Sequence, residues 1–256
     1  MDIATIIGLI LGFGAVIGGQ ILEGGHVSAI IQPTAALIVL GGTMGATFVS
    51  FPLESILHAL KDARKALFPP KDDPEAVIKN IINYAAKARR NGLISLEQEA
   101  QTVKDAFTKK GISLVVDGID PQKLRETMEI ELNSFEEHAK VSAEIFEAAG
   151  GYAPTIGIIG AVLGLIHVMN NLSDSSKLGA GIAVAFVATI YGLMTANIIC
   201  IPCGTKLKKR LQEAILQKEM VIEGLIAIQN GENPHFIEQK LRAYLPEGGA
   251  GAKKGK

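Results

Sequence analysis

Apolar residues gather along this chain in long runs that carry no Asp, Glu, Lys or Arg, and charged residues gather between and after them. The four uncharged runs are residues 3–22, 34–51, 155–173 and 178–203. A helix needs about 20 apolar residues to cross a hydrocarbon layer of roughly 30 Å. Buried helices of soluble proteins seldom extend that far without a charge, so the pattern predicts four transmembrane helices.

The charged segment between the second and third runs shows helical periodicity with clear breaks. An Asp-Pro pair at 73–74 is a typical helix start, and an Asn-Gly pair at 91–92 is a typical end. Ser95 and Gln98 match a capping box, which predicts a second helix as far as Gly111.

A long helix is predicted to begin at the Asp-Pro pair 120–121 and to lead directly into the third span. After the fourth span, 205–229 continues as a helix, and Asn233 begins a last short helix ending near Leu245. Only LVV at 114–116 has strand character, and it is too short to predict a sheet. The expected fold is an all-α membrane protein with four transmembrane helices, a helical cytoplasmic insert between spans two and three, and a helical cytoplasmic tail.

This pattern divides the chain into five segments. They are the first transmembrane pair 1–51, the cytoplasmic helical domain 52–150, the second transmembrane pair 151–203, the cytoplasmic helical tail 204–245 and the low-complexity, disordered tail 246–256. Of 25 Lys and Arg residues, only Lys177 lies in a loop on the other side of the membrane. Because basic loops stay in the cytoplasm, both termini are predicted to be cytoplasmic.

Composition narrows the function classes. The net charge is −1, there is no Trp, and no basic stripe alternates with aromatic residues, so nucleic-acid binding is not expected. The N-terminus lacks the basic region of a cleaved signal peptide and is interpreted as a retained span. Cys200 and Cys203 form a C-x-x-C pair without the further ligands that a zinc site needs, so two small apolar side chains are the favoured interpretation.

Small residues recur at helical spacing in the third and fourth spans. The stripes are Ala153, Gly157, Ala161 and Gly164 in the third span, and Ala185, Thr189, Gly192, Ala196, Cys200 and Cys203 in the fourth. Small residues let membrane helices approach closely. From the sequence, the two stripes are equally compatible with packing against each other and with receiving helices of another chain.

The interior of the spans contains no Asp, Glu, Lys or Arg, and His167, near the outer end of the third span, is the only histidine inside them. A proton or cation carrier needs a carboxylate, a histidine chain or a ring of oxygens at membrane depth. If this chain conducts an ion, a second chain must therefore supply the carboxylate, and Thr189 is the candidate hydroxyl beside it. Pro154 and Pro202, at the cytoplasmic ends of spans three and four, are candidates either for a joint or for helix termination.

Four motifs together resemble the MotA/PomA family of flagellar motor stator subunits. They are KARRNGLISLE at 87–97, GGYAPTIGIIGAVLGLIHVM at 150–169, VAFVATIYGLMTANIICIP at 184–202 and EGLIAIQNGENP at 223–234. The resemblance implies a pentamer in the bacterial inner membrane around single-span MotB-type chains that supply the ion-binding Asp. It implies neither an enzyme activity nor a cofactor.

Residue roles follow from the same resemblance. Thr189 and Ala161 would line the ion path, and Pro154 and Pro202 would couple ion binding to a conformational change. Arg89 or its neighbour Arg90, together with Glu97, would contact the rotor protein FliG.

Ala161 also bears on the transported ion. The sodium-driven relatives carry threonine at the matching position, so the resemblance favours a proton over sodium. Two alternatives stay open at this stage: an ExbB/TolQ-type proton-driven energiser, and a membrane scaffold without a motor role.

Overall fold

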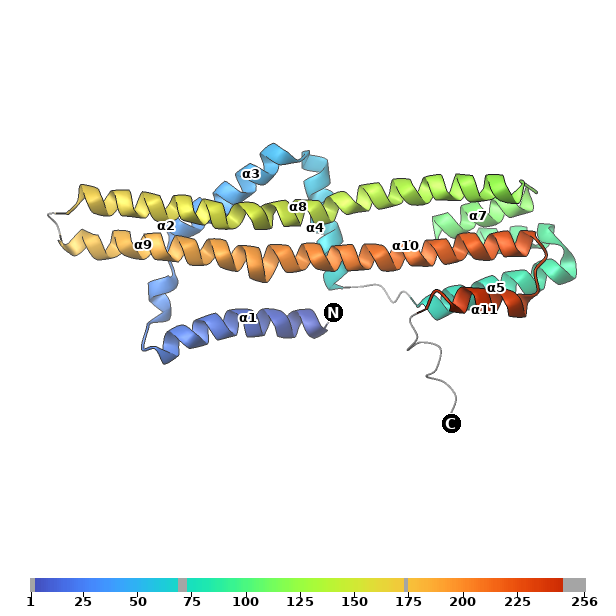
Figure 1. Cartoon of the computed structure of the whole chain (residues 1–256), viewed down its shortest axis with the longest axis horizontal. Coiled ribbons are helices and arrows are strands. Elements are labelled where there is room, and N and C mark those ends of the chain that lie inside the picture. The colour runs from blue at the N-terminus through green and yellow to red at the C-terminus, as the bar shows by residue number, and fades with distance from the viewer. Residues whose placement is uncertain (1–2, 69–72, 173–174, 246–256) are drawn as a thin grey trace. The chain divides into compact units, whose positions relative to one another are not determined.

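The structure, a computed structural model, describes residues 3–68, 73–172 and 175–245, which form helices and contain no strand (Figure 1). The α-helices are α1 (Ile3–Leu22), α2 (Pro33–Ala36), α3 (Gly42–Ser50), α4 (Leu53–Leu67), α5 (Pro74–Asn91), α6 (Glu97–Thr102), α7 (Ala106–Val116), α8 (Pro121–Asn170), α9 (Ser175–Met194), α10 (Ile201–Gln229) and α11 (Pro234–Arg242). Four helical stretches are long and apolar enough to cross a membrane. The predicted all-α, four-span fold is confirmed.

The chain forms two compact units. The first comprises Met1–Pro70 and Ala139–Lys209, and the second comprises Lys71–His138 and Arg210–Lys256. Helices α8 and α10 each contribute to both units. Because α8 is unbroken from Pro121 to Asn170, the prediction that the cytoplasmic helix leads directly into the third span is confirmed.

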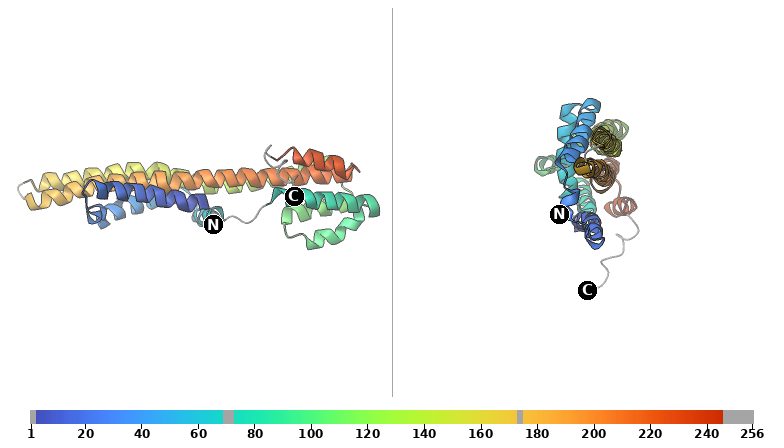
Figure 2. Two further views of the ribbon diagram at one scale, coloured as in Figure 1. Left: turned by 90° about the horizontal axis from the view of Figure 1, so that it is seen from below. Right: turned by 90° about the vertical axis from the view of Figure 1, so that its left-hand side faces the viewer.

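In the first unit, α9 lies along the membrane part of α8, as both views show (Figures 1 and 2). Helix α2 packs on α9 through Ala35 and Ala188, both fully buried. The Tyr191 hydroxyl donates to the Ile30 carbonyl oxygen at 2.6 Å and accepts from the backbone N–H of Gln32 at 3.2 Å. These bonds fix the link before α2. By contrast, α1 has no buried residue, and its apolar side chains remain available to lipid or another chain.

The second unit has one apolar core built around the last part of α10. Met220 and Leu225 of α10 are completely buried and pack with residues of α5, α7, α8 and α11. The predicted helix starts are present: the Asp73 carboxylate accepts from the backbone N–H of Glu75, and the Asn233 side chain accepts from that of His235.

Two local predictions for this unit are wrong. Ser95 does not cap a helix that runs to Gly111: its hydroxyl donates to the Gly92 carbonyl oxygen at 2.6 Å, and residues Leu93–Leu96 form a 3-10 turn (η3). The chain breaks again before α7, where the Asp105 carboxylate accepts from the backbone N–H of Thr108.

The strand character of 114–116 is also misleading, because these residues lie in α7. Ile112 and Val115 are completely buried at helical spacing in the core, so tertiary packing decides their conformation.

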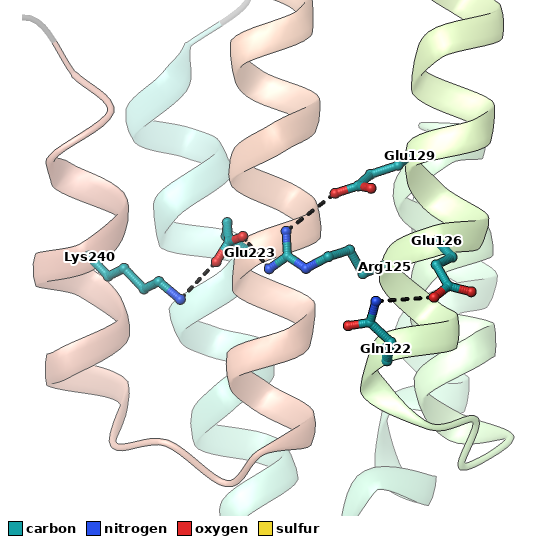
Figure 3. Close-up of polar contacts among 6 residues, drawn as sticks. All are labelled: Gln122, Arg125, Glu126, Glu129, Glu223 and Lys240. Carbon is teal, nitrogen blue, oxygen red and sulfur yellow. Dashed lines mark hydrogen bonds and ion pairs between the residues drawn. The ribbon is translucent and has the colours of Figure 1, made fainter.

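An ion cluster centred on Glu223 joins three helices of this unit. Arg125 of α8 and Lys240 of α11 approach Glu223 of α10 from opposite sides (Figure 3). The Lys240 Nζ lies 2.7 Å from a carboxylate oxygen of Glu223, whose side chain is 14% exposed. Burial by itself would raise the pKa of Glu223, but the hydrogen bonds from Lys240 and Arg125 outweigh it and lower that pKa.

The Glu223→Gln variant should lower the free energy of unfolding at neutral pH by about 1–3 kcal/mol, because two cations lose their shared anion. A lowered folded pKa stabilises the protein above the unfolded pKa, and this contribution is lost as the pH falls through the folded value. The difference between variant and parent should therefore shrink in acid. Thermal unfolding of the detergent-solubilised variant and parent at pH 7 and at about pH 4 measures this difference in stability.

A matched control is Glu219→Gln, one turn earlier on α10, because Glu219 forms no ion pair within the described residues. Equal melting temperatures for the Glu223 variant and the parent at pH 7 would show that the cluster contributes nothing to stability.

Candidate functional site

The two stripes of small residues face each other across α8 and α9. A methyl group built on Gly192 would lie 2.6 Å from the Ala153 carbonyl oxygen, and one on Gly164 would lie 2.8 Å from the backbone nitrogen of Ala185. The helices therefore meet backbone to backbone along several turns. Of the two arrangements that the sequence left open, the structure shows the stripes packed against each other.

Thr189 lies within this contact. A methyl group on Gly157 of α8 would lie 3.5 Å from the Cα of Thr189. The Thr189 hydroxyl donates to the Ala185 carbonyl oxygen one turn earlier, at 3.3 Å, and the side chain is half-buried. Ala161, also half-buried, follows Gly157 by one turn. Both candidate ion-path residues thus belong to the α8–α9 pair.

Neither candidate proline ends a helix. Pro154 is inside α8, and Pro202 is the second residue of α10. A wider π turn, Thr195–Cys200 (η4), comes directly before α10 and continues from α9. Proline lacks the N–H donor and its ring clashes with the carbonyl four residues earlier, and a widened turn relieves both effects. The helix-termination interpretation is wrong, and an irregular but continuous helix replaces it.

Sequence reasoning missed this π turn, for which Pro202 was the only signal. The neighbouring thiols of Cys200 and Cys203 are free, and Cys203 packs beside Ala143 and Leu207.

The candidate rotor-contact residues lie together at one loop of the second unit. Arg89 and Arg90 are in the last turn of α5, and Glu97 begins α6 after the η3 turn. All three are exposed, and none has an ion-pair or hydrogen-bond partner within the described residues. By contrast, the nearby Lys87 pairs with Glu99 at 2.8 Å, which joins α5 to α6.

Comparison with known proteins decides the family. A model described as motility protein A N-terminal matches residues 6–92, and a model of the MotA/TolQ/ExbB proton channel family matches 99–220. Motility protein A of Bacillus subtilis is 38% identical over 250 residues, covering 96% of this chain and 92% of that protein. The chain belongs to the MotA/TolQ/ExbB proton channel family.

Solved structures agree with this assignment. The Campylobacter jejuni MotAB structure superposes with a TM-score of 0.92 at 32% identity, covering 96% of this chain and 97% of that one. The flagellar MotAB stator complex of Bacillus subtilis superposes with a TM-score of 0.87 at 36% identity, covering 96% of both chains.

Within the MotA/TolQ/ExbB family, these matches confirm the prediction of a flagellar motor stator subunit in the bacterial inner membrane. They favour it over the ExbB/TolQ-type energiser, because the N-terminal match is to motility protein A.

Proposed function

We propose that several copies of this chain, five by resemblance, surround a pair of single-span MotB-type chains and conduct protons with them. The observation that carries the proposal is chemical: the four uncharged runs contain no Asp, Glu, Lys or Arg, and His167 is their only histidine, although the chain belongs to a proton channel family. The missing carboxylate is then an Asp of the partner. The likeness to two MotAB structures supports such a partner.

In this proposal the proton path runs beside Thr189 and Ala161, at the α8–α9 pair. Pro154 and Pro202 permit the helices to bend when the partner's Asp is protonated, and the π turn before Pro202 supports a deformable joint there. Both termini and the second unit are cytoplasmic, which places Arg89, Arg90 and Glu97 where they reach the rotor protein FliG.

Co-purification tests the proposed assembly. The chain, tagged and expressed with a MotB-type partner, should elute in detergent as one complex with several copies of this chain per pair of partner chains. It should also restore swimming to a bacterium lacking its own stator. A partner in which the Asp is changed to Asn should co-purify equally well but restore no swimming, since only the proton site is removed.

The alternatives give different results. An energiser subunit would bind an ExbD- or TolR-type chain and leave the bacterium paralysed. With a scaffold that has no motor role, swimming would be the same whether the partner carries Asp or Asn.

A further inference from the structure

The loop that carries the candidate rotor charges also exposes an isoleucine. Ile94 is 73% exposed and lies in η3, between Arg90 and Glu97 in the sequence. We propose that Ile94 is the apolar anchor of the rotor contact, inserting into a pocket on FliG while Arg89, Arg90 and Glu97 form the charged rim. This inference rests on the proposed function.

The fold does not require an apolar residue at this position. In a 3-10 turn, residues three apart lie on the same side. Leu93 and Leu96 are such a pair, and both pack on the core of the second unit, Leu96 with no exposed surface. Ile94 therefore points away from the core. At 73% exposure and outside the core cluster, its side chain contributes little to the folding of the second unit.

The turn that presents Ile94 is held firmly. Gly92 ends α5 with φ +80°, a conformation that favours glycine, and its carbonyl oxygen accepts from both the backbone N–H and the hydroxyl of Ser95. The Lys87–Glu99 ion pair closes the base of the loop. A preorganised loop loses little conformational entropy when it binds, which suits an anchor residue.

The surrounding charges identify the class of partner. Ile94 is flanked by two cations, Arg89 and Arg90, and one anion, Glu97, that form no ion pair with any residue the structure describes. A membrane surface or a nucleic acid would attract the arginines but repel Glu97. A protein with carboxylates and a cation around an apolar pocket complements all four residues. Apolar hot spots ringed by polar contacts are the usual anatomy of such interfaces.

The expected effects differ in size. Burial of a whole isoleucine side chain in a partner's pocket should strengthen binding by about ten- to a hundredfold. An exposed charge pair should contribute less than about fivefold. Ile94→Ser should therefore weaken rotor binding more than the single reversal Glu97→Lys does.

Binding of the purified stator complex to purified FliG tests this directly. The variants are Ile94→Ser, Ile94→Leu, Glu97→Lys and the control Ile130→Ser, which removes an equally exposed isoleucine (71%) from α8. We expect Ile94→Ser to raise the Kd at least about tenfold, Ile94→Leu to bind almost normally, and Ile130→Ser to have no effect. Complex formation with the MotB-type partner should be unchanged in all four.

Two results would overturn the inference in distinguishable ways. If Ile94→Ser binds FliG as tightly as the parent while Glu97→Lys weakens binding, Ile94 is not the anchor but the rotor contact stands. If neither variant changes binding, the assignment of this loop to the rotor fails as well, and the proposed function loses its rotor surface.

Discussion

Replacing Gly192 with leucine should abolish stator function, because no space exists for a side chain where α8 and α9 meet. The first carbon of that side chain would already lie 2.6 Å from the Ala153 carbonyl oxygen and 3.2 Å from the Cα of Pro154. Extra methylene groups in a well-packed interior typically cost about 1–3 kcal/mol, and here backbone atoms must separate. We expect little complex in the membrane and no swimming.

The matched control is Gly179→Leu in the same helix, where a methyl group would meet nothing within 4 Å. That variant should assemble and swim normally. Gly192→Ala should give an intermediate phenotype: the membrane should contain a smaller amount of the stator complex, and that complex should still be functional. Normal complex levels and swimming in Gly192→Leu would show that α8 and α9 do not pack as described. Immunoblots of membranes and swimming speed are the two measurements.

This contact shows how far sequence reasoning reaches. The stripes of small residues were visible at helical spacing, but small residues fit either a helix of the same chain or one of another chain. Only the approach of Gly157, Gly164 and Gly192 to backbone atoms of the facing helix decides between them. The four spans were predictable because a membrane imposes a length and a lack of charge that few other environments impose.

Prediction failed where local signals were weak or conflicting. Ser95 and Gln98 match a capping box, yet Leu93 and Leu96 are drawn into the core and tighten the chain into a 3-10 turn. LVV at 114–116 has strand character, but burial of Val115 in a helix outweighs that local preference. Ile94 carries no sequence signal, since an apolar residue in a loop becomes informative only once its exposure is known.

The second large effect is expected at Pro202. Changing it to leucine restores a backbone donor two residues after the π turn and removes the ring, so the regular α-helix becomes the favoured conformation. Proline inside a helix lowers the stability of the regular α-helical conformation by about 3 kcal/mol. Removing it should therefore make bending at this position unfavourable by an energy of that order. Rotation should fall to a small fraction of normal, while the amount of complex and its partner binding stay unchanged.

The control is Pro234→Leu, at the first position of α11, where the missing N–H would have no helical partner anyway. It should leave rotation intact. If Pro202→Leu instead fails to insert or to bind the MotB-type partner, the proline has a structural role only. Rotation of tethered cells, normalised to the complex present in the membrane, separates the two outcomes.

The remaining question is which ion drives the rotation. Sodium must exchange its hydration shell for several oxygens at once, whereas a proton needs one acceptor carboxylate and a path of water or hydroxyl groups. Thr189 supplies a single hydroxyl oxygen, which keeps its lone pairs while donating its proton to the Ala185 carbonyl oxygen, and Ala161 supplies no oxygen. The chain thus offers few side-chain ligands for sodium at the level proposed for the partner's Asp, and we propose proton coupling.

The most direct test is the rotation speed of cells whose only stator is this chain with its MotB-type partner. External sodium is replaced stepwise by potassium while the proton motive force is held constant. Proton coupling predicts rotation at an unchanged speed in the absence of sodium, and loss of rotation when the proton gradient is collapsed. A speed that rises steeply with sodium and reaches zero in potassium buffer would contradict it.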